Sequence, residues 1–157
     1  MIGDYMFYQC DNLQDIVLPV GVISIGDYAF EGCSSLASVD ISESVTSIGG
    51  YAFFRCYSLT SIDIPEGVTS IEDYVFEGCS SLASIDIPEG VTSIGEWAFV
   101  SCSFLTHVYC YGITPPTIDS SFNGSKDGKT LYVPKGYLSV YQSSSWADFF
   151  GTIQEME

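Results

Sequence analysis

The chain of 157 residues is poor in basic side chains: 4 Lys and Arg stand against 20 Asp and Glu, which gives a formal net charge of −16. A nucleic-acid-binding protein needs a Lys- and Arg-rich face to neutralise phosphates, so this balance excludes that class. Binding to an anionic membrane surface is disfavoured for the same reason. No apolar run approaches the ~20 residues that span a bilayer, so we expect no membrane insertion.

Histidine is also scarce, because His107 is the only one in the chain. The motifs GxGxxG, Walker A, HExxH and CxxC are all absent, so the sequence indicates no cofactor and no metal site. Ser84, Asp86 and His107 lie close together on one predicted surface. A Ser-His-Asp triad also needs an oxyanion hole, and regular strands use their N–H groups in the sheet. We therefore predict no catalytic residues and no enzymatic activity.

Apolar residues are abundant. They make up 46% of the chain, which contains 11 Tyr and 10 Phe, and only 15% of residues are charged. An acidic disordered segment lacks such aromatic content, so a folded chain is expected. The length suits one structural domain, since domains commonly have ~100–150 residues.

An internal repeat of 23 residues determines the architecture. The cysteines show it first, and columns of Phe, Leu, Ile or Val, and Tyr follow the same step. The clearest columns are Cys10, Cys33, Cys56, Cys79 and Cys102; Phe7, Phe30, Phe53, Phe76 and Phe99; Leu13, Leu36, Leu59, Leu82 and Leu105; Ile16, Val39, Ile62, Ile85 and Val108; and Ile2, Ile25, Ile48, Ile71 and Ile94.

Each repeat predicts several short pieces rather than one long element. Residues 36–41 favour a short strand, in which Val39 and Ile41 point inward and Asp40 points outward. A turn follows, and residues 45–48 form a second extended piece. The Tyr-small-Phe segment predicts one helical or 3₁₀ turn. No piece can bury its apolar side alone, so coils must stack ~4.8 Å apart with equivalent residues in ladders.

The pattern L-x-x-I-x-I-P-x-x-V-x-x-I-G-x-x-A-F-x-x-C with period 23 resembles the BspA-like, Treponema-type leucine-rich repeat. The resemblance implies a right-handed leucine-rich-repeat β-solenoid, with a parallel sheet on one face and short 3₁₀ or helical turns and extended segments on the other. It also implies a bacterial cell-surface or secreted, extracellular protein that attaches to host proteins or other cells. A solenoid supports many functions, so this implication is an analogy.

The two ends of the chain differ. Residues 1–111 hold about five repeats, of which the first is incomplete, and residues 112–157 are expected to form a C-terminal cap. The resembled family carries a similar LYVPKG-type tail, and Trp146, Phe149 and Phe150 suit the plugging of an open core. The chain starts inside a repeat without a signal peptide. We therefore expect a fragment of a longer array or, alternatively, a homodimer through the uncapped N-terminal end.

The cysteines are predicted to be free, stacked and buried. Parallel Cβ vectors ~4.8 Å apart exceed the usual disulfide spacing, and five ladder members would leave one unpaired. Asn123-Gly-Ser125 matches a glycosylation acceptor, although a chance match in a polar loop is the simpler interpretation.

The outward positions of the predicted strands form the candidate ligand-binding face. Three hypotheses stand for its acidic columns: a solvated face that keeps the sheet soluble, recognition of a basic partner, and calcium bridging. A further column, from Tyr5 to Trp97, is interpreted as a structural ladder, with an adhesive strip as the alternative. The candidate binding residues are Ser38, Asp40, Ser61, Asp63, Ser84, Asp86, His107 and Tyr109.

Two function classes follow. The first is a non-enzymatic, adhesin-like module that binds a protein or glycan through the strand face, with a partner that is basic or belongs to a host or bacterial surface. The alternative is a structural spacer, a repeat fragment with no ligand of its own.

Overall fold

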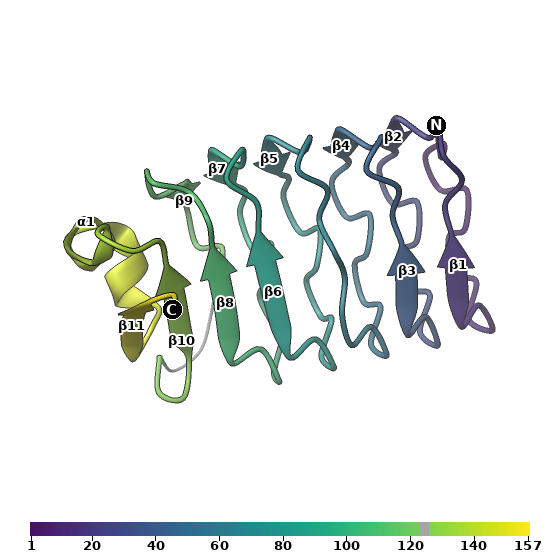
Figure 1. Ribbon diagram of the computed structural model, residues 1–157. Helices are drawn as coiled ribbons and strands as arrows, with labels where there is room; N and C mark the ends of the chain where they lie inside the picture. Colours follow the sequence, from purple (N-terminus) through teal and green to yellow (C-terminus); the bar gives the residue numbers. More distant parts are fainter. Residues whose placement is uncertain (123–125) are drawn as a thin grey trace.

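The computed structural model describes residues 1–122 and 126–157, so the Asn-Gly-Ser match lies outside the described residues. The chain winds into stacked coils, and strands from all but one of these coils line a long parallel face (Figure 1). The strands of this face are β1 (Asp15–Val17), β3 (Ser38–Asp40), β6 (Ser84–Ile87), β8 (His107–Cys110), β10 (Thr130–Val133) and β11 (Thr152–Glu155). In the third coil a single bridge, Asp63 to Asp86, takes the place of a strand. The predicted parallel β-solenoid is thus confirmed.

A second side of each coil holds shorter strands, which form a two-stranded and a three-stranded parallel sheet. The pairs align equivalent residues of successive coils, as in Ser24 with Ser47 and Ser70 with Ser93. The interruption falls between the second and third strands of this side, β4 and β5. The strands are β2 (Ser24–Ile25), β4 (Ser47–Ile48), β5 (Ser70–Ile71), β7 (Ser93–Ile94) and β9 (Thr117–Ile118).

The third side consists of turns where the sequence predicts a helical or 3₁₀ turn. The N–H of Glu31 donates to the carbonyl of Tyr28 over 3.1 Å, which is the i→i+3 bond of such a turn. Tyr28 itself has φ of 58°, and its equivalents share this left-handed conformation. Because a right-handed helix cannot continue through such a residue, the segment makes separate turns. The N–H of Phe30 then bonds the next coil at the carbonyl of Ala52, over 2.8 Å.

The inward columns fill the solenoid with stacked identical side chains. Phe30, Phe53 and Phe76 are completely buried, and the rings of successive coils stack at centroid distances of 5.3 and 5.7 Å. Stacked aromatic pairs contribute about 0.5–1.5 kcal/mol beyond the burial of their area. The apolar residues therefore stabilise coil-to-coil stacking, which one coil could not achieve alone.

All six cysteines are free, as predicted, and five are buried. The prediction of burial is wrong for Cys10, which lies in the first coil and is exposed. Each buried ladder thiol donates a hydrogen bond to a Phe carbonyl of the preceding coil. The distances are 3.2 Å from Cys56 Sγ to Phe30 and 3.2 Å from Cys79 Sγ to Phe53. The column therefore satisfies backbone carbonyls as well as filling space.

The ladders run beyond residue 111. β9 pairs with β7, the ring of Phe122 stacks on Phe99 at 5.1 Å, and β10 pairs with β8. Residues 117–133, as far as they are described, thus continue the solenoid by one further coil, and the cap follows that coil.

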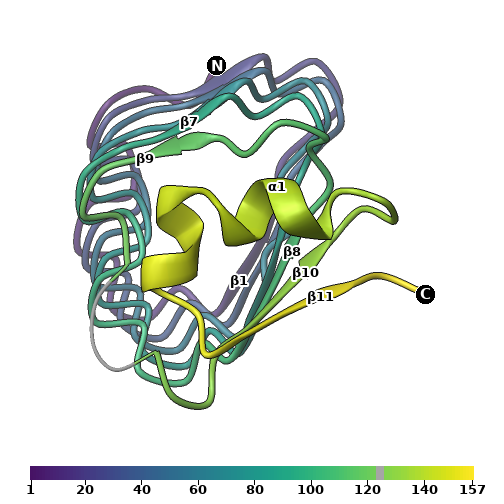
Figure 2. The same cartoon turned by 90° about the vertical axis from the view of Figure 1, so that its left-hand side faces the viewer.

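The cap closes the end of the stack with aromatic side chains. Helix α1 (Leu138–Gln142) and the 3₁₀ turn η1 (Ser145–Asp148) lie across the opening (Figure 2). Tyr141 and Trp146 are fully buried; the indole N–H of Trp146 donates to the Pro116 carbonyl over 2.9 Å. Val140 of the same helix is 42% exposed, because the short helix buries only one narrow side.

The opposite end has no cap among the described residues. Phe7, Leu13 and Ile16 are only half-buried, whereas their equivalents in the second coil are buried. Pairing of two chains through this end stays a prediction.

Candidate binding face

The strand face presents the outward side chains in columns, as the 23-residue period predicts. The register pairs Val17 with Asp40 and Asp86 with Tyr109, and a bridge links Asp63 with Asp86. In the neighbouring column, Ser84 pairs with His107. Seven of the eight predicted residues are exposed and Tyr109 is half-buried, so all of them belong to the accessible face.

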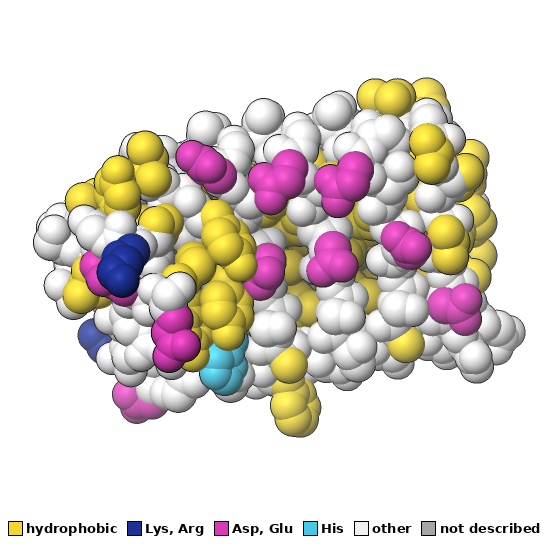
Figure 3. Space-filling model, viewed as in Figure 1, with side chains coloured by type: hydrophobic (Ala, Val, Ile, Leu, Met, Phe, Trp, Pro, Cys, Tyr) yellow, Lys and Arg dark blue, Asp and Glu magenta, His cyan; other side chains and the backbone are white. Residues whose placement is uncertain are grey.

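Two rows of carboxylates cross this face, and an aromatic patch lies beside them (Figure 3). Asp40 and Asp63 line one hollow of 420 Å³, together with Ser38 and Ser61. The other predicted residues lie further along the face, toward the cap. The structure thus distributes the predicted set over two regions of the face.

The aromatic patch contains two tyrosines that the sequence analysis missed. The ring of Tyr132 stacks on Tyr109 at 4.4 Å and on His107 at 5.8 Å. The phenol of Tyr111 donates a hydrogen bond to Asp86 Oδ2 over 3.3 Å. Tyr132 lies one period of 23 residues after Tyr109, so continuing the repeat past residue 111 would have found it. We call Tyr109, Tyr111 and Tyr132 the tyrosine patch.

Two hollows flank Tyr111. The first, of 220 Å³, is acidic and is lined by Asp63, Glu66 and Asp86. The second, of 620 Å³, is lined by the tyrosine patch and by Gln154, Glu155 and Met156 of β11 and the segment after it. Burial, reinforced by the neighbouring Asp86 carboxylate, raises the pKa of Tyr111, so its phenol stays neutral near pH 7.

The partners of His107 do not suit a triad. Its Nδ1 lies 2.8 Å from Oγ1 of Thr106, and its ring stacks on Tyr132. A catalytic His would have one ring nitrogen oriented by the carboxylate and the other bonded to the nucleophile. Ser84 and His107 are instead ordinary neighbours in two parallel strands.

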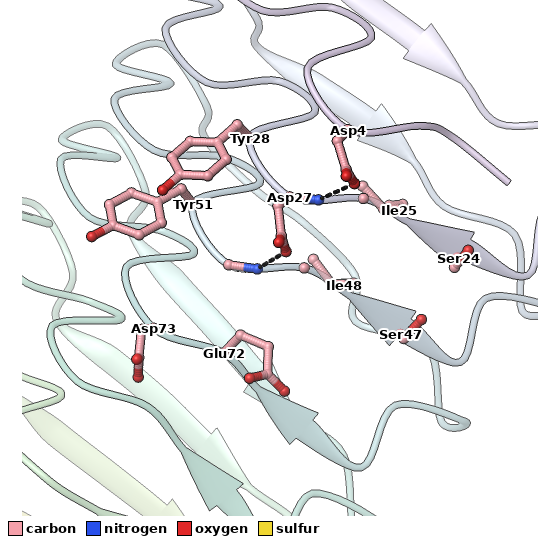
Figure 4. A pocket seen from close by; sticks show the side chains of 13 residues that line it. Asp4, Ser24, Ile25, Asp27, Tyr28, Ser47, Ile48, Tyr51, Glu72 and Asp73 are labelled. Carbon is pink, nitrogen blue, oxygen red and sulfur yellow. Dashed lines mark hydrogen bonds between the residues drawn. The ribbon is translucent and has the colours of Figure 1, made fainter.

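A separate groove of 570 Å³ lies between the second side and the turns, and Figure 4 shows its carboxylates and tyrosines. Asp4 Oδ1 accepts the N–H of Asp27 over 3.0 Å, and Asp27 Oδ1 accepts the N–H of Gly50 over 2.9 Å. Tyr28 and Tyr51 stack at 4.7 Å, which confirms the structural ladder. These groups join successive coils, so this groove is a weaker candidate than the strand face.

Among residues 1–122 and 126–157, no group of three or more His, Cys, Asp or Glu side chains is arranged to hold a metal ion. No helix within the same residues is long and apolar enough to cross a membrane.

The stacked parallel coils define the chain as a β-solenoid of the leucine-rich-repeat type. Residues 1–129 match the model of the BspA type leucine rich repeat region, in six copies. The chain therefore belongs to the BspA-type leucine-rich-repeat family. The sixth copy agrees with the further coil that follows residue 111.

Solved structures give the same result. A leucine rich cell surface protein from Faecalibacterium prausnitzii is 32% identical with a TM-score of 0.62, over 91% of this chain and 32% of its own. The T. pallidum leucine rich repeat protein is 27% identical with a TM-score of 0.69, over 98% of this chain and 61% of its own. The pneumococcal vaccine antigen PcpA shares the fold. It is 18% identical with a TM-score of 0.70, over 95% of this chain and 43% of its own. A search of the curated proteins gives no match.

This chain spans about a third to three-fifths of the length of the first two structures. The family and fold are those of repeat proteins, which are typically not enzymes and commonly serve as interaction modules.

Proposed function

We propose that the chain is a non-enzymatic protein-interaction module that binds its ligand through the strand face, as an adhesin does. The observation that carries this proposal is the tyrosine patch with its two hollows, on a face whose inward side chains fill the core. Exposed aromatic side chains are enriched in interfaces because they bury much area at little entropic cost. The other aromatic column also stacks within the chain, but it lies on the turns and not on the strand face.

The proposed location is the bacterial cell surface or the extracellular medium. Its support is the relative from F. prausnitzii, which is described as a cell surface protein. The buried free thiols are compatible with either redox compartment, because buried cysteine is protected from exchange.

The test places arginine at two exposed positions of the strand face, in the double variant Ser61→Arg/Ser84→Arg. The matched control is Thr46→Arg/Thr69→Arg, at exposed positions beside the second side. Both proteins are assayed against an immobilised panel of matrix proteins, bacterial surface proteins and glycans. We expect the strand-face variant to lose at least ten-fold in affinity for the ligand that wild type binds, while the control stays unchanged.

Equal affinities of the two variants would refute binding through this face. No binding by wild type to any member of the panel would favour the alternative, a structural spacer within a longer surface protein.

A further inference from the structure

We propose that the tyrosine patch and the acidic hollow beside it form a subsite for a cationic polypeptide segment, one that presents arginine or lysine in an extended conformation. The inference rests on the proposed binding function of the strand face and names the chemistry of its partner. It depends on the aromatic residues 109, 111 and 132 together with their carboxylate neighbours. Of these neighbours, only Asp63 and Asp86 were among the sequence candidates.

The electrostatics of the subsite select a cation. The face of a Tyr ring carries negative charge density, which attracts a guanidinium or ammonium group placed over it. The described side chains that line the two hollows include the carboxylates of Asp63, Glu66, Asp86 and Glu155 and no Lys or Arg. Two of these acids already accept a hydrogen bond: Glu155 Oε1 from the N–H of Gly136 over 2.8 Å, and Asp86 Oδ2 from the phenol of Tyr111 over 3.3 Å. The net charge of −16 adds a favourable long-range field for a basic partner.

The arrangement of the hollows selects an extended chain rather than a single ion. The hollows of 220 and 620 Å³ share one wall, Tyr111, whose hydroxyl is fixed on Asp86 at 3.3 Å. A segment that lies along the face passes from the acidic hollow over Tyr111 to the stacked pair of Tyr109 and Tyr132. A basic side chain in the acidic hollow would meet Asp63 and Asp86, whose backbones are bridged across adjacent coils. Its guanidinium can form charge-assisted hydrogen bonds with either carboxylate.

A neutral glycan is the competing occupant, because sugars also stack on aromatic rings. The carboxylates decide between the two, since a sugar gains no charge complementarity from Asp63, Glu66 and Asp86. An acidic glycan would be repelled by the same groups.

The first test compares probes on the unaltered protein, so it does not depend on the folding of any variant. A short peptide of alternating arginine and serine is titrated by calorimetry. The matched peptide carries citrulline, the neutral isostere of arginine, and a neutral oligosaccharide is the third probe. We expect only the arginine peptide to bind, and its affinity to fall with added salt. Equal binding of the citrulline peptide, or binding of the oligosaccharide alone, would overturn the proposal.

The second test locates the subsite. The subsite variants are Tyr132→Leu and Asp86→Asn. The matched controls lie away from the subsite: Tyr57→Leu, at a tyrosine that is 47% exposed, and Glu72→Gln. We expect each subsite variant to bind the arginine peptide about five-fold more weakly, the size of one lost cation–π or ionic contact, and the controls to bind as wild type does. Thermal unfolding checks that each variant is folded.

Equal affinities in subsite variants and controls would contradict the assignment. Failure of the arginine peptide, together with loss of panel binding in Ser61→Arg/Ser84→Arg, would reject the cationic subsite and leave the proposed function intact.

Discussion

The carboxylate of Asp27 occupies the space that a side chain at Gly49 would need. A Cβ at Gly49 would overlap Asp27 Oδ1 and would lie 2.7 Å from the Asp27 backbone nitrogen. The carboxylate itself accepts the N–H of Gly50 over 2.9 Å. The same relationship joins Asp4 with Gly26 and Asp73 with Gly95. An aspartate in one coil and a glycine in the next are therefore a matched pair.

One coil departs from this pairing and shows what it contributes. Gly50 stands where three other coils have Asp and the fifth has Glu96, and Glu72 stands where the other coils have Gly. The second side is interrupted at this place, because β4 pairs with β2 and β5 pairs with β7. Because Gly50 has no carboxylate, the next coil has room for the side chain of Glu72. The short strands β4 and β5 of these two coils do not pair.

Gly49→Ala is expected to destabilise the protein by about 1–3 kcal/mol, because the added methyl overlaps both a side chain and the backbone. Chemical denaturation measures the change, with Gly21→Ala as a control for the loss of glycine at a place with open space. Gly21 has φ of 96°, so the loss of stability in Gly21→Ala measures backbone strain in the absence of a steric clash. In the Asp27→Gly background the penalty at Gly49 should shrink. An unchanged penalty would show that the carboxylate is not the obstacle.

The double variant Gly50→Asp/Glu72→Gly should raise the free energy of unfolding by about 1 kcal/mol, because it restores one charge-assisted hydrogen bond between coils. Urea denaturation of the two single variants completes the cycle. We expect Gly50→Asp alone to destabilise, since its carboxylate then meets Glu72. Additive single effects would show that the two positions are not coupled.

Thiol reactivity should separate Cys10 from the other cysteines. Burial raises the pKa of Cys33 to about 11 and that of Cys102 to about 12, so few of these thiols ionise at pH 8. A thiol reagent should label Cys10 quickly and the five buried cysteines only after unfolding. Rapid modification of more than one thiol in the folded protein would contradict the buried ladder.

The same shift predicts a loss of stability at alkaline pH. Cys102 is protonated when folded up to about pH 12, whereas an unfolded thiol ionises near 9. The folded state therefore holds more protons than the unfolded state between these values, and stability falls as pH rises through the window. Thermal melts from pH 8 to 11 should show a shallower decline in Cys102→Ala than in wild type. Cys10→Ala is the control, and identical slopes would reject the link.

The cap should be necessary for stability. Trp146→Ala is expected to cost about 3–5 kcal/mol, the range for removing a large buried aromatic side chain. It also leaves the Pro116 carbonyl without its indole donor. The control is Phe104→Ala, at an aromatic residue that is 68% exposed. A small effect at Trp146, measured by the unfolding midpoint, would show that the solenoid end does not need this plug.

The period of the sequence predicted most of the fold because each ladder repeats one residue type at one step. The pairing of Asp86 with Tyr109 and the free buried cysteines follow directly from it. The last coil was not predicted because the irregular segment that contains Pro115 and Pro116 interrupts the pattern, and the pairing of Ile94 with Ile118 is one residue longer than the period. Beyond that segment Tyr132 keeps the period of 23 with Tyr109.

Backbone conformation was also beyond the sequence pattern. Tyr28 and its equivalents adopt positive φ, which local preference disfavours for an aromatic residue. Ring stacking at 4.7 Å and hydrogen bonds between coils favour this conformation, and both arise only after the coils assemble. The pairing of Asp with Gly in the next coil is likewise a contact across one period, which a reading of single positions does not reveal.

Binding of a cationic segment at the strand face is tested most directly by NMR. The amide chemical shifts of the isotope-labelled chain are followed during titration with the arginine–serine peptide. We expect the amide signals of residues 84–87, 107–111 and 130–133 to shift together, with a single affinity. Signals on the side of Tyr28 and Tyr51 should stay in place, because that ladder is structural. Shifts confined to the tyrosine ladder, or spread over the acidic surface without preference for the strand face, would contradict the account.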